Sequence, residues 1–157
     1  MTLLTFSELC SALPRHARLL GIDPGKKQVG LALSDVSRMV ATPFATIKRG
    51  RLGAMAAALR TLAQEHEVAG MVIGMPLSLD GSFGPAAQAV RDWALELTVQ
   101  TGLPACLWDE RLSSAAVNRM LIDEADLSRR KRADVVDQLA AAYILQAALD
   151  SLARDNT

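Results

Sequence analysis

The sequence predicts a single α/β domain in which helices cover both faces of a five-stranded mixed sheet. The chain has 157 residues, and 50% of them are hydrophobic, which is enough for one compact core. Three extended segments come first, one directly after another, and helical and extended segments then alternate. The short links between the first three strands indicate antiparallel pairing, whereas strands joined through helices run parallel.

A short helix is predicted before the sheet begins. Its sequence TFSE, which starts at Thr5, has the spacing of a capping box, in which a threonine and a glutamate three residues later satisfy each other's backbone N–H groups. The helix should cover 5–13 and end before Pro14. We expect 1–15 to be a helical appendage of the domain 1–157 and 154–157 to be a frayed tail.

The first three strands are predicted at 18–23, 29–34 and 40–48. The first two are apolar runs joined only by 24–27, a link with proline and glycine that suits the turn of a hairpin. The third contains Pro43, which cannot donate a hydrogen bond within a sheet and therefore favours an edge position.

Helices and strands alternate in the rest of the chain. Apolar residues recur at helical spacing where helices are expected, short apolar runs indicate buried strands, and proline at a first turn marks one helix start. The predicted order is helix 52–66, strand 70–74, loop 75–84, helix 85–100, strand 105–108, a helix from 113 or 114 to 123, charged loop 124–132 and helix 133–153.

Composition excludes several classes of protein. Acidic and basic residues balance at 17 each, so the chain has no general positive field with which to attract nucleic acid, although a local basic patch remains possible. Cys10 and Cys106 are too few for a disulfide framework. Because the sequence has neither an 18-residue apolar stretch nor a signal layout, we expect a cytoplasmic protein without a membrane partner.

Four acidic residues stand near strand ends or a helix start. Asp23 ends the first strand, Glu110 follows the last, and Asp134 and Asp137 lie one turn apart on the last helix. Ligands of open α/β sheets gather beyond the carboxyl ends of the strands. Asp23 and Glu110 would meet there if their strands were parallel neighbours, with the acidic helix face across them.

Clustered carboxylates repel one another unless cations neutralise them, and an oxygen-only ligand set selects Mg²⁺ or Mn²⁺. Two such ions about 3.5–4 Å apart can activate water for phosphodiester hydrolysis. Each acid also has a simpler interpretation. Asp23 suits an Asp-Pro-Gly turn, Glu110 a surface ion pair with Arg111, Asp134 a helix cap and Asp137 a solvated position.

Four ordered motifs, GIDPGKKQVGLALSD, VIGMPLSLDGS, DERLSS and VVDQLAAAYILQ, resemble the YqgF family, also called RuvX. The resemblance covers 18–149. The family is related to RuvC-type Holliday junction resolvases and has an RNase H-like fold. It implies a metal-dependent nuclease, with 5′-end maturation of 16S rRNA, in the context of ribosome assembly, as the usual assignment.

The resemblance also implies site residues. Asp23, Glu110 and Asp137 fall on the catalytic and metal-binding acids of the family, and Asp134 resembles the paired aspartates of resolvases. One departure is Gln28, where the family usually has an arginine. A cation is lost there, although two lysines adjoin it.

Basic and hydroxyl residues near these motifs suit phosphate binding. The loop after strand 70–74 offers serines, and 129–132 is the densest basic run, although such runs are usually only solvated surface. The predicted substrate contacts are Lys26, Lys27, Ser78, Arg111, Ser113, Arg129, Arg130, Lys131 and Arg132.

Several functions therefore compete. The first is a nuclease of structured RNA, with resolution of branched DNA as the nearest alternative of the same chemistry. A non-catalytic module that binds nucleic acid or protein is a second class. Phosphoryl transfer from ATP, as in sugar-kinase and actin-like folds, is a third, but 157 residues leave no room for the second domain it needs. A resolvase would act as a homodimer, whereas the RNA nuclease leaves monomer or homodimer open.

Overall fold

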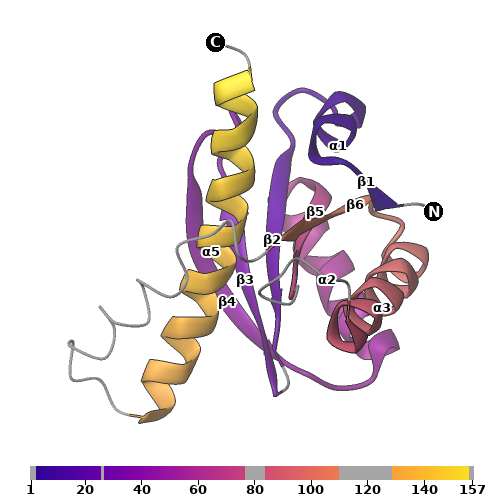
Figure 1. The fold of residues 1–157 in the computed structure, drawn as a ribbon, viewed down its shortest axis with the longest axis vertical. Coiled ribbons are helices and arrows are strands. Elements are labelled where there is room, and N and C mark those ends of the chain that lie inside the picture. Colours follow the sequence, from indigo (N-terminus) through magenta and orange to yellow (C-terminus); the bar gives the residue numbers. More distant parts are fainter. Residues whose placement is uncertain (1–2, 26, 77–83, 110–128, 156–157) are drawn as a thin grey trace.

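A six-stranded sheet in the order β1-β6-β5-β2-β3-β4 forms the centre of the computed structural model (Figure 1). The structure describes residues 3–25, 27–76, 84–109 and 129–155, and within the last range it describes the side chains of 136–152. The elements are β1 (Leu3–Leu4), α1 (Phe6–Ala12), β2 (Arg18–Pro24), β3 (Gln28–Ser34), β4 (Ala41–Lys48), α2 (Leu52–His66), β5 (Val68–Met75), α3 (Pro85–Thr101), β6 (Ala105–Asp109) and α5 (Arg129–Asp155).

The sheet is mixed, as predicted. β2, β3 and β4 pair antiparallel in succession, and β4 forms one edge, which confirms the two predicted hairpins and the edge position of the strand with Pro43. β5 and β6 join β2 in parallel. The prediction of five strands was wrong, because β1 adds a sixth by pairing in parallel with β6. Two residues are too few to show a strand period, and their partner strand lies far along the chain.

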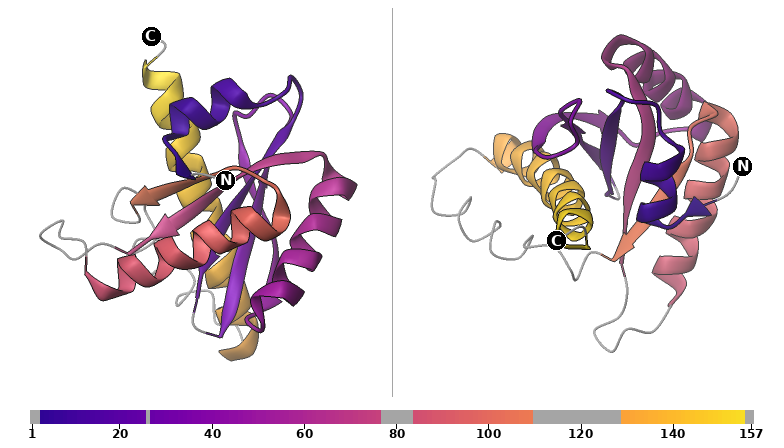
Figure 2. Two further views of the ribbon diagram at one scale, coloured as in Figure 1. Left: turned by 90° about the vertical axis from the view of Figure 1, so that its right-hand side faces the viewer. Right: turned by 90° about the horizontal axis from the view of Figure 1, so that it is seen from above.

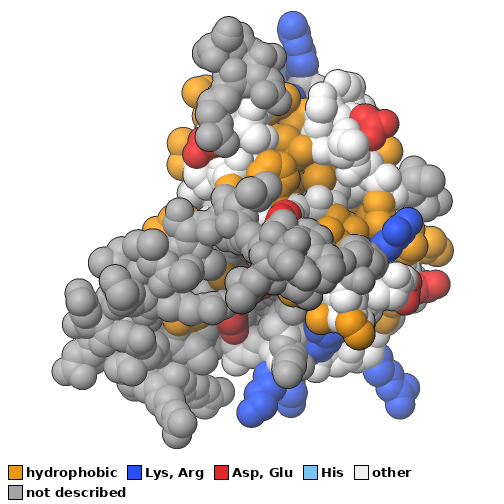
Figure 3. Space-filling view, in the orientation of Figure 1, with side chains coloured by type: hydrophobic (Ala, Val, Ile, Leu, Met, Phe, Trp, Pro, Cys, Tyr) orange, Lys and Arg blue, Asp and Glu red, His pale blue; other side chains and the backbone are white. Residues whose placement is uncertain are grey.

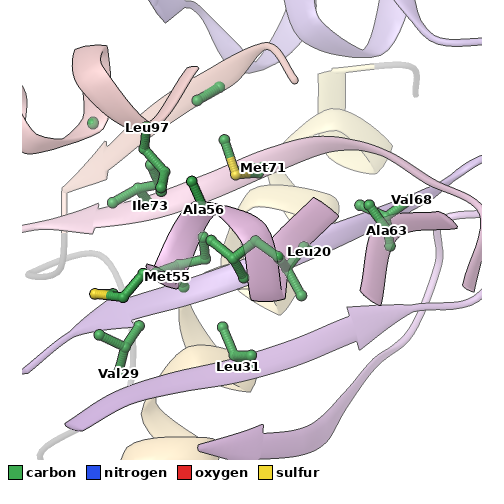
Figure 4. Packing of buried hydrophobic residues seen from close by; sticks show 14 residues of the cluster. Leu20, Val29, Leu31, Met55, Ala56, Ala63, Val68, Met71, Ile73 and Leu97 are labelled. Atoms are coloured by element: carbon green, nitrogen blue, oxygen red, sulfur yellow. The ribbon is translucent and has the colours of Figure 1, made fainter. Parts of the chain in front are cut away.

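Two hydrophobic clusters cover the two faces of the sheet because successive strand residues point to opposite sides. Leu20 lies in the cluster under α2 and α3, whereas Leu19 lies in the cluster under α5 and α1. In β3, Leu31 likewise lies in the cluster under α2 and α3, and Ala32 lies in the cluster under α5 and α1. Figure 2 shows α5 on one side of the sheet and α2 and α3 on the other. Figure 4 shows the first cluster, to which the sheet contributes Leu20 and Leu31 and α2 contributes Met55.

The ends of α1 and α3 follow the predicted signals. Thr5 and Glu8 form the capping box of α1, and Pro85 occupies the first turn of α3. Gly102 ends α3 in the left-handed conformation at φ 74°, which glycine adopts without steric cost.

α5 is longer than predicted. It begins at Arg129, so the basic run 129–132, for which the sequence predicts a loop, lies in its first turn. Arginine and lysine are good helix formers, and this explains the extension. No helix in the described ranges is both long and apolar enough to cross a membrane.

Candidate metal and nucleic-acid site

Asp23 lies in a row of residues that crosses the sheet on the side covered by α5. In β3 its partner is Gly30, and the partner of Gly30 in β4 is Thr46. On the other side, Ile22 pairs with Ile73 of β5, so the next residue, Gly74, is level with Asp23. Both strand neighbours of Asp23 are therefore glycines, so neither neighbouring strand places a side chain beside its carboxylate.

The glycine in β3 brings the last helix close to Asp23. A β-carbon built on Gly30 would lie 2.0 Å from the backbone oxygen of Asp137 and 3.1 Å from its β-carbon. Farther along the same face, a β-carbon on Gly21 would lie 2.8 Å from the backbone oxygen of Ala141. α5 therefore lies with its backbone directly on β2 and β3, an approach that only glycine permits.

Asp23 and Asp137 consequently share one small region. Residues directly opposite in an antiparallel pair point to the same face, with β-carbons about 4.5–5.5 Å apart. Because the β-carbon position of Gly30 is 3.1 Å from that of Asp137, the β-carbons of Asp23 and Asp137 lie within about 9 Å of each other. Both carboxylates can reach a common cation over this separation.

The other predicted acids are placed only in part. Asp134 lies on the backbone of α5, one turn before Asp137, and its side chain is outside the described part of the structure, as is all of Glu110. The premise that the strands leading to Asp23 and Glu110 are neighbours was wrong, since β5 lies between β2 and β6. Among described residues, no group of three histidines, cysteines or acids could hold a metal ion.

The donor chemistry of the described pair nevertheless fits a divalent cation. Asp23 and Asp137 offer only carboxylate oxygens, which Mg²⁺ and Mn²⁺ prefer. The neighbouring strands place only Gly30 and Gly74 beside Asp23, and the backbone of Asp137 fills the space over Gly30. The remaining ligand expected from the sequence, at position 110, follows directly on β6, which ends at Asp109.

The cysteines do not provide an alternative nucleophile. Burial raises the pKa of the Cys106 thiol to about 12, and burial also raises the pKa of Cys10. Both side chains therefore stay protonated at neutral pH, whereas nucleophilic attack requires the thiolate.

Among the predicted substrate contacts, the structure describes Lys27, which is exposed in the turn between β2 and β3. The turn lies beside Asp23 at the end of β2. The run 129–132 starts α5, with side chains outside the described part. Also outside it are Lys26, Ser78, Arg111 and Ser113.

Arg49 is a functional candidate that the sequence analysis missed. Its backbone N–H donates to the Lys27 carbonyl at 2.9 Å, and Nη1 donates to the Gly25 carbonyl at 2.7 Å. Its guanidinium lies 5.3 Å from the centre of the Trp93 ring, within the range of a cation–π contact. Arg49 thus fixes the turn beside Asp23, and the basic stretch Lys48-Arg49-Gly50-Arg51 was the available signal.

The chain is similar in sequence to several known proteins. Residues 17–151 match the family model described as "RuvX: Holliday junction resolvase". A protein of Gluconacetobacter diazotrophicus named "Putative pre-16S rRNA nuclease" is 57% identical and covers 98% of this chain and 99% of its own. An Acidiphilium cryptum protein of the same name is also 57% identical, over 97% of this chain and 96% of its own.

Among solved structures, RuvC from T. thermophilus in complex with a Holliday junction substrate has the same fold. The TM-score is 0.55 at 15% identity, and the match covers 88% of this chain and 96% of RuvC. A second Thermus thermophilus RuvC structure gives a TM-score of 0.50 at 13% identity, over 89% and 97%. With a family model that spans most of its length and relatives at 57% identity, this chain belongs to the RuvX family.

Proposed function

We propose that this protein is a metal-dependent endonuclease that hydrolyses phosphodiester bonds in precursor 16S rRNA. The observation that carries the proposal is the contact of α5 with Gly30, which holds Asp137 beside Asp23 on one face of the sheet. An acidic pair at the end of a strand is tolerable when cations neutralise it. The RNA substrate is inferred from the relatives named for pre-16S rRNA.

In this mechanism Asp23, Glu110 and Asp137 would hold two divalent ions, with Asp134 assisting. Such ions would supply the activation of a water molecule and the stabilisation of the leaving oxygen. Asp23 lies in a strand and Asp137 in a helix packed on it, so both ligands stand on rigid elements. The phosphates on either side of the scissile bond are contacted by Lys27, by the basic run 129–132 and by the serines predicted from the sequence.

Cleavage of a labelled RNA that contains the 5′ precursor end of 16S rRNA tests the proposal. With Mg²⁺ or Mn²⁺, wild-type protein should cut, and Asp23→Asn and Asp137→Asn should each slow cleavage by at least about 100-fold, since losing a metal ligand should cost more than losing its outer-shell partner. Asp92→Asn, an exposed acid on α3, is the matched control and should cut normally. Equal cutting by wild type and Asp23→Asn would overturn the catalytic assignment.

Resolution of branched DNA is the second candidate, favoured by the name of the matching family model. It uses the same acids, so the same variants serve. A four-way DNA junction offered beside the RNA separates the two candidates, since a resolvase makes paired cuts across the junction and leaves the RNA intact.

A further inference from the structure

Lys48 is a cation on the same face of the sheet as the two aspartates. It pairs with Gln28, two positions along β3 from Gly30. The residue before it, Ile47, packs in the cluster under α2 and α3, and strand side chains alternate, so Lys48 takes the opposite face, under α5. That is the face on which Asp23 and Asp137 meet.

The backbone that carries Lys48 is held firmly. The next residue, Arg49, makes the two hydrogen bonds to the β2–β3 turn and the contact with Trp93 described above. Lys48 itself is exposed, and its side chain makes no hydrogen bond or ion pair with another described residue. A lysine anchored at its Cα, with its ammonium group in solvent, is well suited to meet a ligand that arrives from outside.

The side chain of Gln28, the strand partner of Lys48, carries a polar atom without a hydrogen bond to a described residue. Gln28 Oε1 is buried and has no hydrogen-bond partner among the described residues. A glutamine amide can turn to offer its NH₂ group from the same place, and a phosphate oxygen would accept from it. Buried polar groups are rarely left without a partner, so this position suits a polar ligand.

The surroundings favour an anion. α5 runs from its basic first turn toward Asp137 over eight residues, about 12 Å of helix, and begins at the same end of the molecule as the β2–β3 turn (Figure 1). Figure 3 shows Lys and Arg side chains gathered at that lower end. The chain has zero net charge, so this concentration of positive charge is local.

We propose that Lys48 and Gln28 form a contact for a backbone phosphate of the nucleic-acid substrate, next to the scissile bond. The inference deepens the proposed nuclease function and rests on it. Because the contact is made only to a phosphate, it gives no base specificity. It fixes the position of the nucleic-acid strand relative to Asp23 and Asp137.

Binding of a fluorescein-labelled RNA stem-loop, and of a labelled four-way DNA junction, measured by anisotropy without divalent ions, tests this contact apart from cleavage. Lys48→Gln should weaken binding of at least one of the two about three- to tenfold, and the slope of log K against log salt should fall by about 0.7–0.9. Arg15→Gln removes the same charge from an exposed site before β2, at the other end of that strand, and should leave binding of both unchanged.

The double variant Gln28→Lys/Lys48→Gln sharpens the test. It moves the cation to the directly opposite strand position on the same face, and it should recover most of the lost affinity. Wild-type affinity in Lys48→Gln, an equal loss in Arg15→Gln, or failure of wild-type protein to bind either probe would overturn the proposal. Binding that depends on Lys48 in a protein that cuts neither substrate would uphold this contact and refute the proposed nuclease function.

Discussion

Gly30 and Gly21 decide how closely the last helix approaches the sheet. Each lies where a β-carbon would meet the backbone of α5, at Asp137 and Ala141 respectively. Backbone atoms cannot rotate away as a flexible side chain can, so any larger residue must displace the helix. The position of one candidate metal ligand therefore depends on the absence of a single methyl group in β3.

Gly30→Ala should lower the free energy of unfolding by about 3 kcal/mol, the upper end of the usual cost of overpacking, because the clash at 2.0 Å is with backbone. Urea unfolding followed by circular dichroism measures this loss. Gly50→Ala is the control, since nothing lies within 4 Å of a β-carbon built there, and it should change stability by less than about 0.5 kcal/mol. Similar values for the two variants would refute the close approach of α5.

Asp35 makes stability depend on pH in the acid range. Hydrogen bonds from the Ser37 hydroxyl and from the Val40 and Met39 backbone lower the pKa of Asp35 from 3.8 to about 2. A lowered folded-state pKa stabilises the protein above pH 4, and this contribution is lost as pH falls toward 2. The difference in melting temperature between wild type and Asp35→Asn should be largest above pH 4 and vanish near pH 2, and a difference that grows toward pH 2 would contradict this.

Single site residues could be predicted from the sequence where their position at a strand end or on a helix face was itself predictable. Asp23 and Asp137 were named from a strand end and a helix face, and the structure places them on one face of the sheet. Arg49 could not be assigned, because its partners Gly25 and Trp93 come from segments that are brought to it only by the fold. The register that puts Lys48 opposite Gln28 was likewise hidden until the strands were paired.

Elements were predicted best where the apolar residues recur at helical spacing or where the ends carry a proline or glycine signal. α2 covers Leu52–His66 as expected, and α3 lies between its Pro85 start and Gly102. β1 was missed because its stability comes from pairing with β6 rather than from its own two residues. The start of α5 was missed because charged residues, read as a loop, also favour helices.

The capping box of α1 gives a prediction for a whole element. The Thr5 hydroxyl accepts from the Glu8 N–H at 3.2 Å, and the Glu8 carboxylate accepts from the Thr5 N–H at 2.9 Å. Thr5→Ala removes the first bond and should cost about 1 kcal/mol of unfolding free energy in a urea titration. Thr61→Ala, at an exposed site of α2 where the hydroxyl only donates to the Ala57 carbonyl, is the matched control and should not destabilise the protein.

On the scale of the whole molecule, the candidate site exists only when both layers of one face are assembled. β2 contributes Asp23, α5 contributes Asp137, and the cluster of α5 with Leu19, Ala32 and Val72 holds them together. Any ion that binds both acids must therefore favour the folded chain over the unfolded one.

Thermal unfolding with increasing Mn²⁺ checks this linkage without any substrate. At 100 times the dissociation constant, the ion should stabilise wild-type protein by about 2.7 kcal/mol, seen as a rise in melting temperature. Asp137→Asn should show a much smaller rise, and Asp150→Asn, an exposed acid on the same helix, should behave as wild type. A rise of equal size in Asp137→Asn would mean that the ion binds elsewhere.

The contact between the Asp137 backbone and Gly30 also has a consequence during synthesis of the protein on the ribosome. The strand with Asp23 is synthesised long before the helix with Asp137, and the two acids meet only when that helix settles on the finished sheet. If these two acids hold the metal ions as proposed, the chain becomes able to cleave RNA only after translation has passed the last helix.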